Sequence, residues 1–385
     1  MSKINKIIPY NKHFIDNNDI KNVIKTLNSD FISSGPNISS FENKIKKYLG
    51  GKYCCAVSSG TAALHLAGLA LNWKKNDIII TSPITFVASA NSILYSGATP
   101  DLVDINYETN CIDLNKLENK LKTKNIRALI AVDYAGYPCD WENLKYLSQK
   151  YRFTLINDNC HALGSKLNGD KKYALKYADI DIQSFHPTKN ITTGEGGAII
   201  TNNKFIHQKI ISLRNHGMIK NNNKNYLWKY KVKMLGYNYR MTDIQAALGI
   251  SQMKKIDLFV KKQNSIAQIY DKEFENFEEL ETLKQRDNRF VSYHLYPLKI
   301  NFKKLKISKN DFFKKMLKNK IRLQVHYIPI HLHDFYKKNY FKNSKLYPMS
   351  NIFYEREVSL PIFPFLERKH QYYIINTLKN NLFKI

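Results

Sequence analysis

The stretch Asp181–Thr201 reads DIQSFHPTKNITTGEGGAIIT and holds the most informative pattern in the chain. Its apolar beginning, Ile180 to Phe185, predicts a strand that runs into a polar loop carrying Ser184 and Lys189. A glycine-rich turn around Gly194 then returns the chain into a second apolar run, Ala198 to Thr201. The pattern therefore predicts two strands joined by a loop that presents a lysine.

Short β-rich runs alternate with helical patterns from residue 50 to about residue 215. The other predicted strands are Tyr53–Val57, Asp77–Thr81, Pro100–Ile105, Ala128–Asp133 and Phe153–Asp158. Strands that alternate with helices indicate crossover units and a largely parallel sheet covered on both faces. We therefore expect an α/β fold with a mixed, mostly parallel central sheet.

The two ends of the chain have a different character. The first 45 residues carry two helical patterns that flank the loop Asp30–Pro36. An amphipathic stretch, Thr242–Tyr270, predicts one long helix that leads into a smaller α+β unit. That unit is predicted to contain a strand at His294–Ile300, a helix at Lys309–Lys320 and a strand at Leu323–Tyr327. We expect a large domain over residues 1–250, a small one over 251–385, and an irregular surface loop at Lys220–Lys233.

Composition excludes several classes of protein. No apolar run approaches the roughly 18 residues of a membrane span, and Met1 to Tyr10 does not resemble a signal peptide, so we expect a cytoplasmic protein without a membrane partner. The five cysteines lack metal-binding spacing, and no metal is expected. The formal charge of +28 comes from scattered lysines. Such scatter favours compositional bias over a nucleic-acid site, and its field would attract a polyanionic small molecule.

A Ser/Gly/Thr motif, Ser58 to Ala63, follows the first predicted strand and opens an apolar helix. Free N–H groups and the helix dipole favour an anion there, and Gly60 would let a phosphate approach closely. An ordinary N-cap is the alternative.

Two further candidates lie at the same expected edge of the sheet. Asp158 closes a strand and is followed by His161, where a carboxylate could hold a heterocyclic nitrogen protonated. Phe86 lies at a strand-to-helix turn, where an aromatic ring could stack on a planar heterocycle. A capping aspartate, a structural histidine and a core phenylalanine are the alternatives.

Lys189 stands out because of its setting. A free lysine with a pKa near 10.4 is almost entirely protonated at neutral pH and is a poor nucleophile. Burial, or a Schiff base with a cofactor aldehyde, removes that obstacle.

With these motifs in place, nearly the whole chain resembles the sugar-nucleotide aminotransferases of pyridoxal-phosphate fold type I, the DegT/DnrJ/StrS type. The stretches that carry the resemblance are Ser59–Leu66, Pro83–Ala88, Val132–Gly136, Asp158 with His161–Gly164, Ser184–Gly197, Leu213–Gly217 and Gly236–Met241. Within that family, Ser184–Gly197 and Val325–Ile330 are similar to the branch of the pseudaminic acid pathway. One departure is Asn159 and Cys160, where the family usually has two small residues.

The resemblance implies that Lys189 forms a Schiff base with pyridoxal 5′-phosphate, that Asp158 pairs with the ring nitrogen and that Phe86 stacks on the ring. It also implies cofactor contacts from Gly60, Thr61, His161, Ser184 and the partner subunit's Asn238, and hence a homodimer. The substrate contacts that it implies are Tyr10, Asp30, Phe31, Ile32, Ser33, Ser59, Ser184, Asn238, Tyr327, Ile328, Pro329 and Ile330.

The same branch implies a reaction. L-glutamate would give its amino group to the cofactor, leaving pyridoxamine 5′-phosphate. The group would then pass to C4 of a UDP-linked 4-keto-6-deoxy-N-acetylhexosamine, forming UDP-4-amino-4,6-dideoxy-N-acetyl-β-L-altrosamine. Another nucleotide keto-sugar, dTDP- or UDP-linked and aminated at C3 or C4, is one alternative. A basic nucleic-acid-binding protein without catalysis is another. Sugar dehydratases of this fold typically have His where Lys189 stands.

Overall fold

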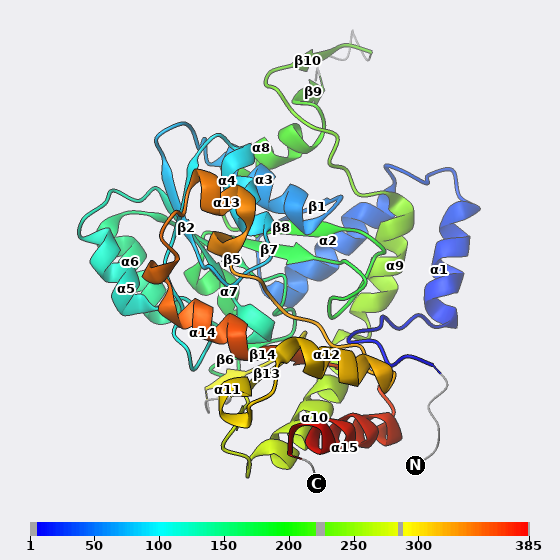
Figure 1. Ribbon diagram of the computed structural model, residues 1–385. Coiled ribbons are helices and arrows are strands. Elements are labelled where there is room, and N and C mark those ends of the chain that lie inside the picture. The colour runs from blue at the N-terminus through cyan, green and yellow to red at the C-terminus, as the bar shows by residue number, and fades with distance from the viewer. Residues whose placement is uncertain (1–5, 221–227, 284–287, 384–385) are drawn as a thin grey trace.

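A computed structural model describes residues 6–220, 228–283 and 288–383. Its centre is a seven-stranded sheet in the order β1-β8-β7-β5-β4-β2-β3 (Figure 1). The strands are β1 (Tyr53–Val57), β2 (Ile78–Thr81), β3 (Thr99–Leu102), β4 (Ala128–Val132), β5 (Thr154–Asp158), β7 (Ile180–Ser184) and β8 (Gly197–Thr201). Only β8 runs antiparallel to its neighbours. The predicted mixed, mostly parallel sheet is confirmed.

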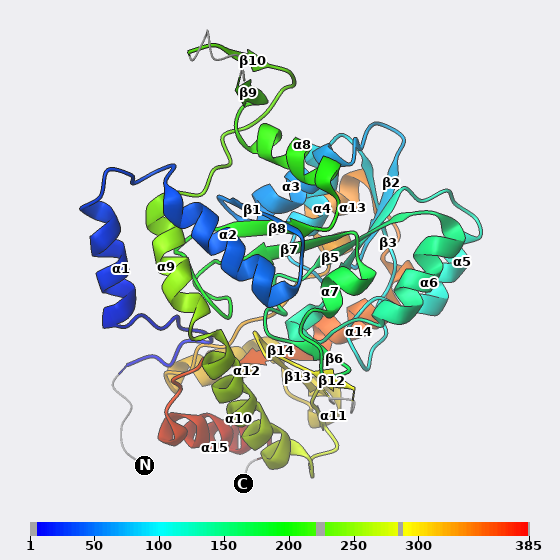
Figure 2. The same ribbon diagram turned by 180° about the vertical axis from the view of Figure 1, so that it is seen from behind.

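Helices cover both faces of this sheet because successive side chains of a strand point to opposite sides (Figures 1 and 2). Ile79, Ile130 and Ile156 face one helical layer, whereas Ile80, Leu129 and Leu155 face the other. The first layer consists of α3 (Gly60–Ala70), α4 (Ala88–Tyr95) and α8 (Lys204–Arg214). The second contains α2 (Pro36–Leu49), α5 (Leu114–Leu121), α6 (Trp141–Tyr151), α7 (Tyr173–Tyr177) and α9 (Asp243–Met253). A short 3-10 turn, η1 (Tyr134–Gly136), follows β4.

The two predicted N-terminal helices are present as α1 (Asn17–Leu27) and α2, and α1 packs beside α9. The prediction of one long helix over Thr242–Tyr270 is wrong, because the chain leaves the helical path at Lys254 and Lys255. It forms α9 and then α10 (Ile256–Phe274). The amphipathic period continues across this break, so the sequence pattern does not reveal it. A domain boundary at residue 250, which lies inside α9, stays a prediction.

The C-terminal part is an antiparallel sheet, β11-β13-β14, with helices packed against it. Its elements are β11 (Leu280–Glu281), β13 (Tyr296–Ile300), α11 (Phe302–Leu305), α12 (Lys309–Lys318), η2 (Ile330–Leu332), α13 (Asp334–Asn339), η3 (Ser344–Leu346), α14 (Pro348–Arg356), β14 (Glu357–Leu360) and α15 (Arg368–Phe383). The predicted strand Leu323–Tyr327 is wrong, since only Gln324 pairs with Ser359. The next ladder step is lost because the His326 N–H donates to the Glu357 carboxylate instead.

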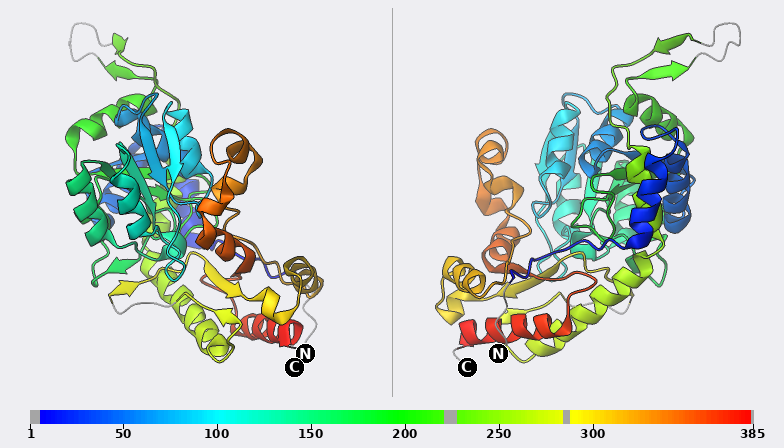
Figure 3. Two further views of the ribbon diagram at one scale, coloured as in Figure 1. Left: turned by 60° about the vertical axis from the view of Figure 1, so that its left-hand side comes forward. Right: turned by 90° about the vertical axis from the view of Figure 1, so that its right-hand side faces the viewer.

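A hairpin projects from the body of the molecule (Figure 3). It consists of β9 (Met218–Lys220) and β10 (Tyr230–Val232), which pair antiparallel, so the predicted irregular loop at Lys220–Lys233 is wrong at its ends. Residues 221–227 of that loop lie outside the described residues. A second small pair joins β6 (Lys166–Leu167) to β12 (Arg289–Phe290). Among the described helices, none combines the length and the apolar character needed to cross a bilayer.

Candidate active site

The main sequence candidates meet at the carboxyl ends of three strands. Asp158 ends β5, Ser184 ends β7, and Ser59 and Gly60 follow β1. These strands run in one direction, so their carboxyl ends form one edge of the sheet, which is where open α/β sheets bind ligands. The topology therefore brings together residues that are up to 125 positions apart, from Ser59 to Ser184.

The junction of β1 and α3 forms a cradle for an anion. Ser59 caps the helix, its Oγ accepting from the Ala62 N–H at 3.0 Å. The N–H groups of Gly60 and Thr61, in the first turn, have no partner within the helix. A Cβ atom added to Gly60 would lie 2.9 Å from the Ser184 Cβ and 3.2 Å from its Oγ. Glycine thus keeps open a space bordered by backbone N–H groups and a hydroxyl.

Asp158 is buried and its carboxylate is only partly satisfied. The Ser89 hydroxyl donates to Oδ2 at 2.7 Å, and the Cys160 N–H approaches Oδ1 at 3.3 Å. Ser89 is in turn hydrogen-bonded to the Thr85 hydroxyl at 2.8 Å. A carboxylate offers about four acceptor positions, so Asp158 can still accept a hydrogen bond from a ligand. The free acceptor positions of Asp158, at the ligand-binding edge of the sheet, fit a role in ligand binding better than a role in helix capping.

The loop between β7 and β8 holds Lys189 by short-range hydrogen bonds. The Lys189 N–H donates to the His186 carbonyl at 2.9 Å, and the Thr192 hydroxyl donates to the Phe185 carbonyl at 3.0 Å. Gly194 closes the loop with a φ of +80°, a conformation that favours glycine. Burial lowers the pKa of Lys189, while nearby Cys160 and Asp158 oppose that change. The lysine is therefore easier to deprotonate than one in water.

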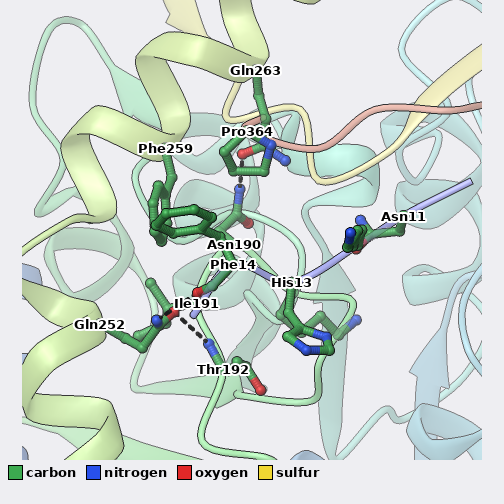
Figure 4. A pocket seen from close by; sticks show the side chains of 12 residues that line it. Asn11, His13, Phe14, Asn190, Ile191, Thr192, Gln252, Phe259, Gln263 and Pro364 are labelled. Carbon is green, nitrogen blue, oxygen red and sulfur yellow. Dashed lines mark hydrogen bonds between the residues drawn. The ribbon is translucent and has the colours of Figure 1, made fainter. Parts of the chain in front are cut away.

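A narrow pocket adjoins Lys189 and shows what supports this loop (Figure 4). Gln252 of α9 accepts from the Thr192 N–H at 3.4 Å and donates to the Phe14 carbonyl at 2.9 Å. Gln263 of α10 accepts from the Asn190 amide at 3.3 Å. The two helices on either side of the Lys254–Lys255 break thus fix the lysine loop and the N-terminal segment together.

Aromatic and imidazole rings surround the open side of the site. Phe86 is 54% exposed, and its ring lies 5.9 Å from that of Tyr327, which leaves a face free for stacking. The Ala135 N–H points at Nδ1 of His161 at 3.4 Å, so Nε2 carries the proton and donates to the Tyr327 hydroxyl at 2.9 Å. Burial holds the pKa of His161 well below its usual range, and nearby Lys189 lowers it further. His161 is therefore neutral.

One residue beside Lys189 was missed by sequence reasoning. Nε2 of His294 lies 3.4 Å from the Lys189 Nζ, and its ring lies 4.5 Å from that of His161. The two residues are 105 positions apart, and His294 precedes β13 in the C-terminal part. No local pattern could have joined them.

The implied substrate residues fall into two groups. Tyr10 packs against His326 with ring centroids 5.4 Å apart, which places it near Tyr327. Asp30–Ser33 instead form an exposed loop whose Ile32 and Ser33 carbonyls accept from the first N–H groups of α9. Pro329 and Ile330 are buried, Ile330 within an apolar cluster, and only Ile328 is exposed among these three. The structure gives the Ile330 side chain a packing role.

The residues present fit pyridoxal phosphate. The cradle at Gly60, Thr61 and Ser184 suits a phosphate dianion. The spare acceptor of Asp158 suits a protonated ring nitrogen, and the low pKa of Lys189 suits bonding to an aldehyde.

Comparisons with known proteins agree with a site that binds pyridoxal phosphate. The chain is 39% identical over 381 residues, 98% of each chain, to the UDP-4-amino-4,6-dideoxy-N-acetyl-beta-L-altrosamine transaminase of Campylobacter jejuni. Helicobacter pylori PseC, described as an aminotransferase involved in the biosynthesis of pseudoaminic acid, superposes with a TM-score of 0.91 at 32% identity, covering 99% of this chain and 100% of that chain. Spr1654 from Streptococcus pneumoniae, 29% identical, superposes in its PLP form with a TM-score of 0.91 and in its PMP form with 0.92, covering 98% of this chain and 99% of that chain.

A family model described as the DegT/DnrJ/EryC1/StrS aminotransferase family matches residues 13–379, almost the whole chain. This match agrees with the α/β architecture of the large sheet. The chain therefore belongs to the DegT/DnrJ/EryC1/StrS aminotransferase family, and it is a pyridoxal-phosphate-dependent aminotransferase.

Proposed function

We propose that the protein aminates C4 of a UDP-linked 4-keto-6-deoxy-N-acetylhexosamine with L-glutamate as donor, forming UDP-4-amino-4,6-dideoxy-N-acetyl-β-L-altrosamine. The observation that carries this proposal is the identity of 39% over 98% of both chains to the Campylobacter jejuni transaminase named for that product. The structural likeness to Helicobacter pylori PseC supports it.

Lys189 and Asp158 have the central roles in this proposal. When bound, pyridoxal phosphate supplies an aldehyde that can carry the amino group and a ring that accepts electrons. Asp158 would hold the proton on the ring nitrogen, since its carboxylate has spare acceptor capacity. Lys189 would bond to the cofactor at rest and, once released, would move the proton at C4 of the sugar. Its lowered pKa suits both tasks.

The remaining residues would bind and orient. Gly60, Thr61 and Ser184 would hold the phosphate, Phe86 would stack on the ring, and His161 would lie beside it. Tyr10, Ser59 and Tyr327 with Ile328 are proposed to contact the sugar nucleotide. The exposed loop Asp30–Ser33 is hydrogen-bonded to the start of α9 at Asp243 and Ile244. Asn238 precedes that start by a few residues, so we propose that the loop acts together with Asn238.

A substrate panel tests the reaction. The enzyme is incubated with glutamate and a set of UDP- and dTDP-linked 3-keto and 4-keto sugars, and the amino product is identified by NMR. We expect the UDP-linked 4-keto-6-deoxy-N-acetylhexosamine to react at least about tenfold faster than the others in kcat/KM. Preference for a dTDP-linked or a 3-keto sugar would reject this substrate assignment and leave the aminotransferase chemistry intact.

We also propose a homodimer in which Asn238 serves the neighbouring site. Tyr237 and Tyr239 stack on one another at 5.1 Å and pack against His65, while Asn238 between them is exposed. Side chains alternate along an extended segment, so Asn238 points away from its own helical layer. Leu235, three residues before Asn238, is 84% exposed, and Trp228, just before β10 in the projecting hairpin, is 76% exposed; both offer apolar surface to a second copy of this chain.

Mixing two damaged chains tests this arrangement. Lys189→Ala lacks the lysine, and Asn238→Ala is expected to be strongly weakened. If Asn238 acts in the partner's site, a mixed dimer contains one intact site. Denaturing and refolding equal amounts together should therefore restore about a quarter of the original activity. If Asn238 acts in its own chain, no site is repaired and activity does not return. Light scattering should give a mass of twice 45.0 kDa.

A further inference from the structure

His294 is the buried histidine that lies against Lys189 and that neither the family motifs nor the proposed roles use. Its Nε2 atom is 3.4 Å from Nζ of Lys189. Nδ1, its other ring nitrogen, meets no side-chain partner among the described residues, and the backbone of Thr188 is the polar group that the ring approaches besides Lys189. Nε2 is therefore the ring atom through which His294 meets the Lys189 side chain.

The ring of His294 has little freedom to move. It is almost completely buried, packs 4.5 Å from the ring of His161, and begins a segment that continues directly into β13. Lysine, by contrast, has a flexible four-carbon side chain. A rigid ring beside a flexible amine sets where the amine lies.

The direction of the hydrogen bond follows from charge. A protonated lysine has three donors and no lone pair, so the imidazole nitrogen beside it must accept. Burial lowers the pKa of His294 well below its usual range, and Lys189 lowers it further, so the ring is neutral and able to accept. Asp158, Cys160, His161 and His326 also surround Lys189, and the two histidines are likewise held neutral by burial.

We propose that His294 is a positioning residue, which accepts a hydrogen bond from the Lys189 Nζ, fixes the place of that nitrogen and stabilises its charged form in a site that excludes water. This inference rests on the proposed role of Lys189 as the cofactor lysine. It assigns a function in the site to the C-terminal part, which supplies His294 from the segment just before β13.

An isosteric pair of variants tests the proposal. Glutamine can place an oxygen near the position of Nε2, whereas methionine has a similar length without a strong acceptor. The full-length chain, stripped of cofactor, is pulsed with acetic anhydride over a range of pH. Acetylation of Lys189 is then quantified by mass spectrometry. His294→Met should lower the pH at which acetylation of Lys189 is half-maximal by about half to one pH unit. His294→Gln should keep this midpoint near the original value.

The holoenzyme gives a second readout. His294→Met should lower kcat by about tenfold with little change in KM, and His294→Gln should recover most of that loss. Thermal unfolding is followed for each chain, and His294→Leu replaces the methionine variant if that variant does not fold.

An unchanged or raised Lys189 midpoint in the methionine variant would overturn the proposal, as would a glutamine variant that behaves like methionine. Failure of the proposed role of Lys189 would look different. Lys189→Ala would then remain active, whatever the midpoints of the His294 variants.

Discussion

Two aspartates at the carboxyl ends of neighbouring strands have opposite surroundings. Asp133 follows β4 and Asp158 ends β5, and the residue before Asp133, Val132, pairs directly with Asp158. Both side chains are buried. From the sequence alone, each closes an apolar strand in the same way.

Asp133 is saturated by its own chain. Its Oδ1 accepts from the Cys139 N–H at 2.8 Å and from the Trp141 indole at 3.0 Å. Its Oδ2 accepts from the Asn157 amide at 3.1 Å and from the Tyr173 hydroxyl at 2.6 Å. Among the described residues, Asp158 accepts from the Ser89 hydroxyl and the Cys160 N–H, with the Cys160 thiol beside it. A carboxylate with all its acceptor positions filled stabilises the fold, whereas one with spare capacity can bind a ligand.

The largest expected effect concerns the lysine that shares the site with Asp158. Lys189→Ala should lower the rate of amino transfer by about 10⁴-fold or more, because both the cofactor bond and the proton transfer are lost. The measurement is the turnover of keto-sugar with glutamate. The melting temperature of the cofactor-free chain should change little. Full activity in this variant would reject the assignment of Lys189.

Asp158→Asn is the next test. The amide cannot hold a positive charge on the ring nitrogen, so turnover should fall by about 10² to 10⁴-fold. Since Ser89 and Cys160 are the donors to Asp158 within the described part of the chain, the free energy of unfolding should change by less than about 1 kcal/mol. A stable, fully active variant would show that the spare acceptor has no role.

Asp133→Asn should give the reverse result. The new amide group faces buried donors that lose their acceptor, so the free energy of unfolding should fall by about 3 to 5 kcal/mol. Urea unfolding of the cofactor-free chain measures this loss. Activity per folded molecule should stay within about threefold of the original. If this variant were stable but inactive, the distinction between the two aspartates would fail.

A third carboxylate, Asp181 on β7, adds a dependence on pH. Asn159 and Gln183 donate to it, both at 2.7 Å, yet burial raises its pKa to about 7. The folded chain therefore keeps a proton that the unfolded chain releases near pH 4. Stability from this group is complete below about pH 4 and is lost as pH rises to about 7, by roughly 2 to 4 kcal/mol.

Urea unfolding at several pH values measures this slope. Asp181→Asn has no proton to release, so its stability should vary less between about pH 4 and about pH 7. An equal slope in both chains would assign the pH dependence to other groups.

The smallest effect is expected for Ser89→Ala. The Ser89 hydroxyl donates to Asp158 at 2.7 Å, so its loss leaves the carboxylate less well oriented. Affinity for pyridoxal phosphate, measured by fluorescence titration, should weaken by about tenfold. A matched control is Ser148→Ala, since the Ser148 hydroxyl donates to the Lys145 carbonyl within α6, away from the site, and its loss should leave affinity unchanged.

Much of the fold and part of the site could be predicted. The seven apolar runs that became the central sheet were predictable because a doubly covered strand must be apolar over most of its length. Asp158, Ser184 and Gly60 could be placed at one edge because parallel strands end together. The break at Lys254–Lys255 and the single bridge at Gln324 could not, since both depend on what each segment packs against.

Local residue order alone determined the strand–loop–strand unit around Lys189, the glycine that opens the cradle and the helices that cover the sheet. These features follow from side-chain periodicity and backbone preference, which act over a few residues. Only the tertiary structure decided which aspartate has spare acceptors and which histidine meets the lysine. Hydrogen-bond saturation and the contact between His294 and Lys189 join positions far apart in the chain, and folding alone brings them together.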